Sequence, residues 1–441
     1  MNAMHDQQES EVGVIPEGWS IASLGDLGRC IRGVSYKPEH LMQETGEGVT
    51  TLLRSNNIKN DRVNFDDVQF VAGCKISEDQ LVRPFDIAIC MSNGSKALVG
   101  KSGVVTPAHL ARHSRLTVGA FCAIYRSPVQ YTAQIFKSQF FQSAVDIQLA
   151  GSAINNLKGS DIEGIQFPLP PLEEQQKIAA ILTAVDDKLD VIARQIDATQ
   201  SLKQGLVQTL FSRGVGTQDA AGEWVPHTEF KLISSRTVPV AWSARRLGEI
   251  APLVRRPVEI DPDAIYPELG LRSYGKGTFH KPALTGAEVG NKRLFQIKTG
   301  DLLFSNVFAW EGAVAVARPE DDGRYGSHRY ITCAVDASQA DTNFLFRYLT
   351  TPAGIASLTL ASPGGAGRNK TLGLGALADI AVPLPPLNEQ RKIGQILDGV
   401  DAKLHALDSK RAACEALKRG LMQKLLTGEW RVNVDPSATG T

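Results

Sequence analysis

The chain has 441 residues, which exceeds one typical domain and allows two or three. Its hydrophobic content of 43% and charged content of 21% are ordinary for globular proteins. The 47 Lys and Arg residues balance the 47 Asp and Glu residues. The overall charge therefore does not indicate a nucleic-acid-binding protein, and any basic surface has to be local.

The cysteines and the terminal composition exclude several further classes. The six cysteines are scattered without a Cys-x-x-Cys pair, so neither a zinc site nor a disulfide framework is indicated. The first ten residues are polar, and no apolar run approaches the ~20 residues that span a bilayer. We therefore expect a cytoplasmic protein with no metal and no membrane contact.

Composition along the chain predicts seven segments. They are a flexible tail (1–14), a globular unit (15–167), a long helix (168–213), a polar, Gly-rich linker (214–237), a second globular unit (238–382), a second long helix (383–427) and a tail (428–441). The globular units share markers: residues 83–89 (RPFDIAI) parallel residues 298–304 (KTGDLLF), and each predicts a turn that feeds a buried strand. Residues 132–149 and 343–360 are each predicted to form one short helix.

The two long helices begin with the same motif. Residues 168–178 read PLPPLEEQQKI and residues 383–393 read PLPPLNEQRKI, and fifteen of the twenty-two pairs from Pro168/Pro383 onward are identical at an offset of 215. Prolines cannot continue a helix, so each helix has to start after its Pro-Pro pair. An internal repeat of this kind indicates two copies of one unit.

Apolar residues then recur in steps of three and four, near the 3.5-residue period of a coiled coil. The predicted helix-pairing residues are Ile178, Leu182, Val185 and Leu189 in the first copy and Ile393, Leu397, Val400 and Leu404 in the second. The stripe is expected to resume at Leu202 in the first copy and at Cys414 and Leu417 in the second, and Arg411 interrupts it where the first copy has Ile196. Each helix would be ~60 Å long, and the natural partner of each is the other copy. The predicted fold class is α+β, with two globular domains joined by two long helices that form an antiparallel coiled coil with pseudo-twofold symmetry.

A long acid-free stretch is the main indication of a binding surface. No Asp or Glu occurs from Ile87 to Val145, and residues 269–287, 289–300 and 342–378 are shorter windows of the same kind. Clustered cations without carboxylates favour phosphate contact, although a solvated face that lacks acids is the alternative. The candidate DNA-binding residues are Lys96, Lys101, Arg112, Arg115, Asn156, Lys158, Arg272, Lys276, His328, Arg329, Arg368, Asn369 and Lys370.

Catalytic motifs are not recognisable in the sequence. Residues 94–102 (GSKALVGKS) resemble a phosphate-binding P-loop but carry one residue too many between the glycines, and a strand is expected to follow them. His113 and His328 lie in register at the offset of 215, which fits a core or hinge role or a DNA contact. Gly205 and Gly420 also match and indicate either close approach of another backbone or simple tolerance. No carboxylate pair, nucleophile triad or metal-ligand spacing stands out, so we expect no catalytic residues and no cofactor.

The duplicated Pro-Leu-Pro-Pro-Leu-x-Glu-Gln motif, followed each time by a long helix, resembles the specificity (S) subunit of type I restriction–modification systems. The resemblance covers residues 15 to about 432. It implies two target recognition domains that read double-stranded DNA, an antiparallel helical spacer, no catalytic site, and docking of two methyltransferase (M) subunits, with restriction (R) subunits in the full complex. The half-sites read by two divergent domains should differ, giving a bipartite asymmetric target.

Two other readings remain open. A coiled-coil adaptor with two protein-binding domains would have the same repeat. An enzyme, such as a methyltransferase or P-loop NTPase, is disfavoured because the sequence contains neither an Asn/Asp-Pro-Pro-Tyr/Phe motif nor a correctly spaced P-loop.

Overall fold

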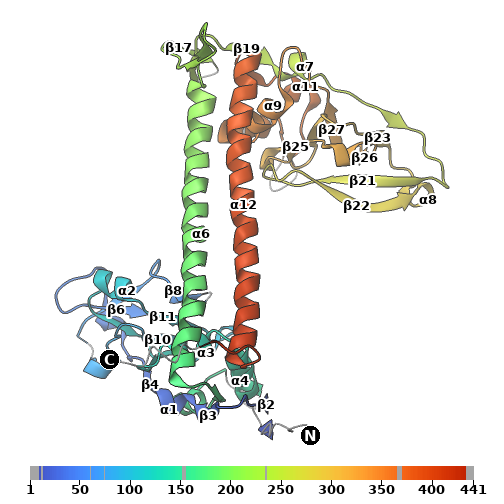
Figure 1. Cartoon of the computed structure of the whole chain (residues 1–441). Coiled ribbons are helices and arrows are strands. Elements are labelled where there is room, and N and C mark those ends of the chain that lie inside the picture. Colours follow the sequence, from blue (N-terminus) through green and yellow to red (C-terminus); the bar gives the residue numbers. More distant parts are fainter. Residues whose placement is uncertain are drawn as a thin grey trace. The chain divides into compact units, whose positions relative to one another are not determined.

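The computed structural model describes residues 9–10, 13–59, 61–73, 75–150, 155–233, 236–364 and 370–433. The chain divides into two compact units, the first with residues 1–193 and 409–441 and the second with residues 194–408. Both units combine strands with helices, so the predicted α+β class is confirmed. Two long helices, α6 (Leu172–Arg213) and α12 (Leu387–Leu426), each contribute residues to both units (Figure 1).

The first unit contains a six-stranded sheet in the order β4-β13-β10-β11-β8-β7 and a four-stranded sheet in the order β12-β6-β9-β5, while β14 pairs with β3 and β1 with β2. Its strands are β1 (Glu9–Ser10), β2 (Gly13–Val14), β3 (Ser20–Ser23), β4 (Arg29–Arg32), β5 (Leu41–Met42), β6 (Thr50–Leu53), β7 (Ile58–Lys59), β8 (Arg62–Val63), β9 (Gln69–Val71), β10 (Ile87–Cys90), β11 (Ser102–Val104), β12 (Leu116–Val118), β13 (Cys122–Arg126) and β14 (Gln166–Leu169). Its shorter helices are α1 (Leu24–Leu27), α2 (Pro107–Arg112), α3 (Tyr131–Phe136), α4 (Gln139–Ala150) and α5 (Gly159–Glu163), with 3-10 turns η1 (Pro38–His40), η2 (Ser55–Asn57), η3 (Glu78–Gln80) and η4 (Lys96–Leu98).

The second unit contains a five-stranded sheet in the order β20-β23-β26-β21-β22 and a three-stranded sheet in the order β25-β24-β27, while β19 pairs with β28. Its strands are β15 (Thr217–Gln218), β16 (Trp224–Val225), β17 (Phe230–Ile233), β18 (Arg236–Pro239), β19 (Ser243–Arg246), β20 (Pro257–Val258), β21 (Ile265–Leu271), β22 (Thr278–Thr285), β23 (Leu294–Gln296), β24 (Leu302–Ser305), β25 (Val314–Val316), β26 (Tyr325–Ser327), β27 (Tyr330–Cys333) and β28 (Ala381–Leu384). Its shorter helices are α7 (Leu247–Ile250), α8 (Gly286–Val289), α9 (Thr342–Leu349), α10 (Pro352–Leu360) and α11 (Leu374–Ala378), with η5 (Ala309–Glu311) and η6 (Pro319–Asp321).

The predicted buried strands are confirmed as β10 and β24, whose residues are all buried. The same turn precedes both. The buried Asp86 side chain accepts the N–H of Arg83 at 2.7 Å, and the buried Asp301 side chain accepts the N–H of Lys298 at 2.8 Å. Each carboxylate also binds an arginine, Arg126 for Asp86 at 2.7 Å and Arg256 for Asp301 at 2.6 Å. A buried carboxylate needs such a charge-assisted partner, which explains why an Asp occurs in both copies of the turn.

The prediction of one helix over residues 132–149 and one over 343–360 is wrong, because each range holds two helices. Between α3 and α4, the Ser138 hydroxyl accepts the N–H of Phe141 at 3.2 Å and so caps a new helix. Between α9 and α10, Thr351 caps in the same way, accepting the N–H of Gly354 at 3.1 Å, and Pro352 occupies the first helical position.

The repeated Glu-Gln pair anchors the start of each long helix. The side-chain amide of Gln175 donates to the Pro170 carbonyl at 2.7 Å, and that of Gln390 donates to the Pro385 carbonyl at 2.8 Å. These bonds satisfy carbonyl groups that the prolines leave without a helical partner. The motif is therefore a helix-start device that recurs because both helices begin in the same way.

The preceding glutamate of each motif is also buried and ties a distant segment to the helix. Glu389 accepts the Nε1–H of Trp242 at 3.0 Å and the backbone N–H groups of Val215 and Gly216 at 2.8 and 3.1 Å, and it contacts His227 Nε2 at 3.0 Å. The segment expected to be a linker therefore includes two small hairpins, β15–β16 and β17–β18, and a fixed contact with α12.

The equivalent Glu174 in the first unit has a different partner. It accepts Arg431 Nε at 2.9 Å, and the Arg431 guanidinium lies 5.8 Å from the centre of the Trp19 ring. Because Arg431 follows α12, residues beyond the second long helix contact the start of the first within this unit.

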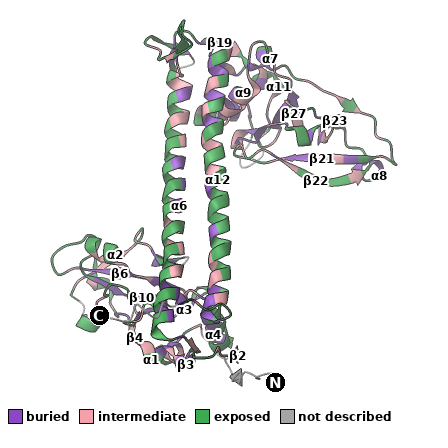
Figure 2. Ribbon diagram, viewed as in Figure 1, coloured by how far each residue is buried: buried purple, intermediate pink, exposed green. Residues whose placement is uncertain are grey.

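Burial varies along the two long helices (Figure 2) and corrects the predicted continuation of the apolar stripe at Leu202 and Leu417. Ile178 and Leu182 are buried with Met422 and Leu425 in the first unit's core. Ile393 and Leu397 are buried with Leu210 in the core of the second, whereas Val185, Leu189, Val400 and Leu404 are half-buried.

Leu202 and Leu417, however, are 53% and 56% exposed, so they do not continue the stripe. The predicted Cys414 is buried, as is its counterpart Thr199, and one turn further Lys203 and Lys418 lie on the same face. Steps of three and four residues from Ile196 lead to Thr199 and then to Lys203. The apolar stem of such a lysine can cover the apolar surface of the helix face while its ammonium group binds a carboxylate.

Candidate nucleic-acid interface

In the first unit, the loop that follows β10 joins the segment that follows α4. The N–H of Leu157 donates to the Met91 carbonyl at 2.8 Å, Ser92 forms a β-bridge with Asn156, and the Asn155 amide donates to the Gly94 carbonyl at 3.2 Å. Three predicted DNA-binding residues lie on these two segments and are exposed: Lys96, Asn156 and Lys158. Lys101 lies beside them, just before β11, and is half-buried.

The other two candidates of this unit lie elsewhere. The Arg115 carbonyl accepts the N–H of Thr51, at the start of β6, at 2.9 Å. Asn93 of the β10 loop instead donates to the Ser55 hydroxyl, beyond the end of β6, at 3.2 Å. Since a four-residue strand spans ~13 Å, Arg115 and its neighbour Arg112 are separated from the β10 loop by the length of β6.

Two further cations of the acid-free stretch are already paired. Arg126 binds Asp86, and Lys137 binds Asp186 at 2.6 Å. The absence of acids within a stretch of sequence therefore does not show that its cations are available, because the partners come from other elements.

In the second unit, the loop that follows β24 gathers most of the predicted residues. The N–H of Leu372 donates to the Asn306 carbonyl at 2.8 Å, and the N–H of Asn306 donates to the Arg329 carbonyl at 2.7 Å. Lys370 Nζ lies 4.8 Å from the centre of the Trp310 ring. Arg368 and Asn369 lie outside the described residues.

The β21–β22 turn joins the same cluster. The N–H of Tyr274 donates to the Glu311 carbonyl at 2.9 Å, which places Arg272 and Lys276 beside η5. The Arg272 guanidinium stacks on Phe279 at 4.8 Å and donates to the Thr278 carbonyl at 2.7 Å, so its direction is fixed although it is exposed. His328 and Arg329 are exposed.

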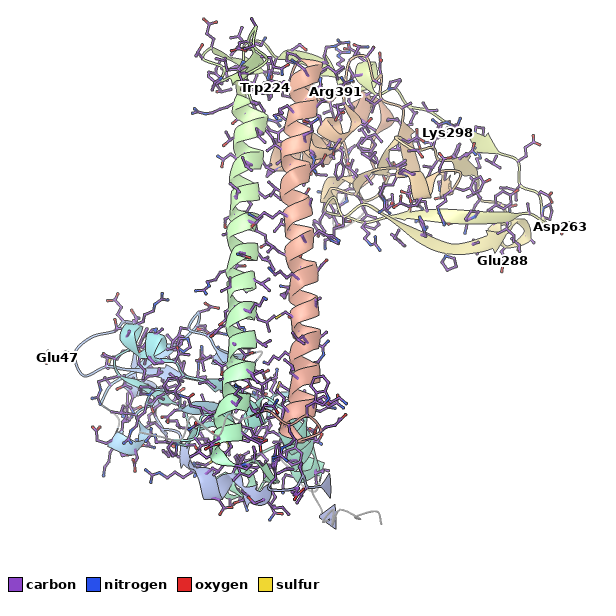
Figure 3. All side chains as sticks on the ribbon, viewed as in Figure 1. Glu47, Trp224, Asp263, Glu288, Lys298 and Arg391 are labelled. Carbon is purple, nitrogen blue, oxygen red and sulfur yellow. The ribbon has the colours of Figure 1, made fainter. Side chains whose placement is uncertain are left out.

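The hairpin also separates charges. Asp263 and Glu288 lie at its end remote from the turn (Figure 3). The seven residues of β21 place that acidic end ~23 Å from the basic turn.

The join between the two segments is the same in both units. Leu157 and Leu372 are 215 residues apart, as are their acceptors Met91 and Asn306, and both bonds measure 2.8 Å. The side chains around this join differ between the units. A constant backbone thus carries two different sets of polar groups.

Exposed aromatic side chains beside the join were missed by sequence reasoning. Phe121 is 69% exposed, and its carbonyl accepts the N–H of Met91 at 2.9 Å. In the second unit Tyr274 is 69% and Phe308 41% exposed. No sequence signal separates these rings from core aromatics, because exposure depends on tertiary packing. Aromatic faces next to cations suit stacking on bases.

The two histidines that lie in register in the sequence, His113 and His328, have different surroundings in the structure. His113 stacks on Phe65 at 4.5 Å, and burial, helped by the charge of Arg112, lowers its pKa. His113 therefore packs within the first unit, whereas His328 is exposed on the second.

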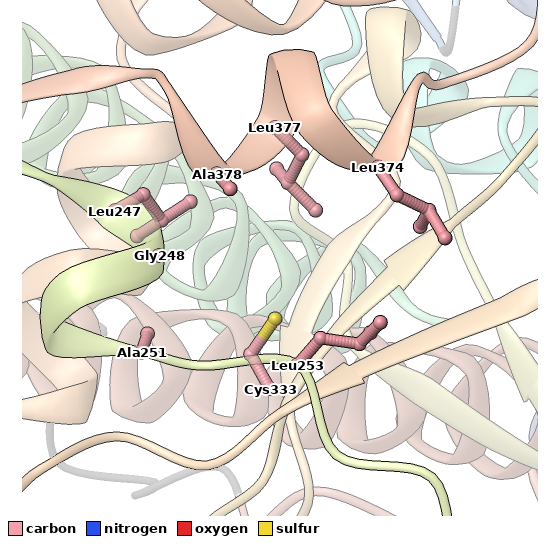
Figure 4. A pocket seen from close by; sticks show the side chains of 8 residues that line it. All are labelled: Leu247, Gly248, Ala251, Leu253, Cys333, Leu374, Leu377 and Ala378. Carbon is pink, nitrogen blue, oxygen red and sulfur yellow. The ribbon is translucent and has the colours of Figure 1, made fainter.

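A small cavity of about 30 Å³ in the second unit offers no chemistry (Figure 4). Its lining is apolar apart from Cys333, and burial raises the pKa of that thiol to about 12, so it stays protonated. The residues that the structure describes contain no group of three His, Cys, Asp or Glu side chains able to hold a metal. Among the described helices, none is long and apolar enough to cross a membrane.

Comparison with known sequences gives the family. The type I restriction modification DNA specificity domain matches residues 127–199 and 239–413. The chain belongs to this family. It is a type I specificity subunit with two recognition domains, the DNA-recognition component of a restriction–modification system.

Relatives of this specificity subunit match all or part of its length. The StySPI specificity subunit of Salmonella potsdam is 26% identical over 95% of this chain and 91% of its own. The EcoKI specificity subunit of Escherichia coli K12 is 35% identical over 45% of this chain and 41% of its own. The crystal structure of a type I system S subunit from M. genitalium is 14% identical with a TM-score of 0.55, covering 99% of both chains, and shares the fold.

Proposed function

We propose that this subunit reads a bipartite, asymmetric target on double-stranded DNA, one half-site through residues 15–167 and the other through residues 238–382. The observation that carries the proposal is the backbone join found in both units, surrounded in each by a different set of exposed cations, amides and aromatic rings. A shared backbone join with different side chains around it suits two half-sites of different sequence.

The chemistry of the two clusters supports contact with DNA. Lys96 and Lys276 are exposed ammonium groups suited to phosphate oxygens. Asn156 and Arg272 carry the side chains that pair with base edges, Asn with adenine and Arg with guanine. Phosphate contacts would position each domain and base contacts would specify the sequence.

The spacer is proposed to be an antiparallel coiled coil of α6 and α12 with pseudo-twofold symmetry. In the first unit Asp186 of α6 binds Lys418 of α12 at 2.8 Å, and in the second Asp401 of α12 binds Lys203 of α6 at 2.6 Å. Residues 186 and 401 are equivalent in the repeat, as are 203 and 418. Such exchanged pairs are what a twofold axis between two copies produces. Because duplex DNA has the same symmetry, the domains would face two half-sites separated by an unread spacer.

The subunit is further proposed to act without catalysis of its own, in the cytoplasm, where it docks two methyltransferase subunits and, in the full complex, restriction subunits. The repeat supports the stoichiometry, since two copies of one unit offer two equivalent docking surfaces. Methyl transfer and cleavage would then belong to those partners.

Methylome sequencing of cells that carry the methyltransferase subunits, with and without this chain, tests the proposal. We expect one bipartite motif that disappears with the chain. Exchanging residues 15–165 for the equivalent part of another specificity subunit should change one half-site only. A motif altered in both halves would contradict independent recognition domains.

A further inference from the structure

We propose that Asp186 and Asp401 are positioning residues that lock each recognition domain to the two spacer helices in one register, and so set the spacing at which the half-sites are read. The inference rests on the proposed bipartite function. It concerns a carboxylate on a long helix that binds one cation of the recognition domain and one cation of the other long helix, an arrangement found in both units.

The first cluster joins three elements. Asp186 of α6 binds Lys137, the C-cap of α3, at 2.6 Å and Lys418 of α12 at 2.8 Å. The three side chains are only 13 to 18% exposed. One carboxylate therefore holds the recognition domain and the second helix at the same point of the first helix.

The second cluster repeats this arrangement. Asp401 of α12 binds Arg347 of α9 at 3.0 Å and Lys203 of α6 at 2.6 Å. Here the carboxylate and Lys203 are 38% and 37% exposed, and Arg347 is 11% exposed. Because solvent screens this pair more, the second cluster should hold its domain less tightly than the first.

The neighbouring helical turn carries a second matched contact. Gln134 donates to the Thr183 hydroxyl at 3.3 Å, and Asn343 donates to Asp398 at 2.8 Å. Thr183 and Asp398 are equivalent in the repeat. Both domains thus place one face of a short helix against the same two positions of a long helix, although the domain residues themselves differ.

The electrostatics make the first cluster specific to one register. Burial acts to raise the pKa of Asp186, but the charges and hydrogen bonds of Lys137 and Lys418 outweigh it and the pKa lies below its usual value. A one-turn slide of either helix moves a side chain by ~5.4 Å, which separates these atoms and leaves a poorly solvated carboxylate without its cations. That cost disfavours neighbouring registers.

Methylation of a plasmid library tests the inference. The library carries both half-sites at spacings from two base pairs shorter to two longer than the native one, in cells that express the complete methyltransferase complex. We expect the wild-type complex to methylate one spacing, whereas Asp186→Asn should raise methylation at neighbouring spacings roughly tenfold relative to the native spacing. The half-site sequences should not change. Asp401→Asn should give a smaller effect.

Two further variants make the result decisive. Asp187→Asn is the matched control, because this exposed neighbour should keep the wild-type spacing profile. Lys137→Gln keeps the Asp186–Lys418 pair and removes the ion pair between Asp186 and the domain, so it should relax spacing even if Asp186→Asn fails to accumulate. A wild-type profile in Lys137→Gln would overturn the inference. Wild-type methylation of a plasmid in which one half-site is scrambled would instead overturn the proposed bipartite function.

Discussion

Glu389 gives the sharpest prediction about what holds the second unit together. Its side chain is 1% exposed and contacts four groups: Trp242 Nε1, His227 Nε2 and the backbone N–H groups of Val215 and Gly216. Replacement by Ala leaves these polar groups buried without their acceptor. Since breaking a buried, charged network costs about 3–5 kcal/mol, we expect Glu389→Ala to destabilise the second unit by that amount.

The repeat supplies an internal comparison. Glu174 occupies the same position in the first unit, but the side chain of its partner Arg431 is 43% exposed and can turn to water when the carboxylate is removed. Arg431 donates to both carboxylate oxygens of Glu174, and losing charge-assisted bonds to an exposed group of this kind costs about 1.5–3 kcal/mol. Glu174→Ala should therefore be the milder change.

Scanning calorimetry of the two variants measures the difference. At about 2–4 °C per kcal/mol for a unit of this size, Glu389→Ala should lower Tm by roughly 10 °C and Glu174→Ala by roughly half as much. Hydrogen exchange at the amides of Val215 and Gly216 should accelerate only in Glu389→Ala. The exposed Glu173→Ala is the control, with an expected loss below about 1 kcal/mol. If Glu389→Ala behaved like this control, the buried contact would have no structural role.

Four further variants test other features. Gly205→Ala should stabilise the chain by about 1 kcal/mol, because nothing lies within 4 Å of an added Cβ. Gly214→Ala should destabilise it, since its φ is +69° and the added Cβ would lie 2.2 Å from Glu389 Oε1; urea unfolding that showed both variants changing stability in the same direction, or each in the reverse direction, would refute this. Lys96→Ala should weaken DNA binding by the complex and reduce the slope of log K against log salt by ~1, and an unchanged slope would show that Lys96 makes no phosphate contact. The lowered pKa of Asp186 means that its contribution is present above the unfolded pKa of about 3.9 and is lost as pH falls below it. Asp186→Asn should accordingly flatten stability against pH in that acid range, and a slope identical to that of the wild type would count against the ion pairs.

Much of the candidate site could be named but not assembled from the sequence. Lys96, Arg272 and Lys370 were identified because they lie in acid-free windows, and the structure places them at the backbone joins. Arg115 was chosen by the same rule and lies beyond the length of β6. A window of sequence cannot separate these cases, because strand pairing decides which end of a sheet a residue reaches.

The sequence by itself determined the two-copy organisation, the long helices and their starts. These features follow from local rules, since the Pro-Pro pair, the Glu-Gln caps and the apolar spacing act within a few residues of each other. Only the tertiary structure decided that Lys203 and Lys418, rather than Leu202 and Leu417, lie on the helix face that meets the core. A lysine can occupy that face only where a carboxylate from the other helix meets it. Such a partner comes from roughly two hundred residues away, where periodicity carries no information.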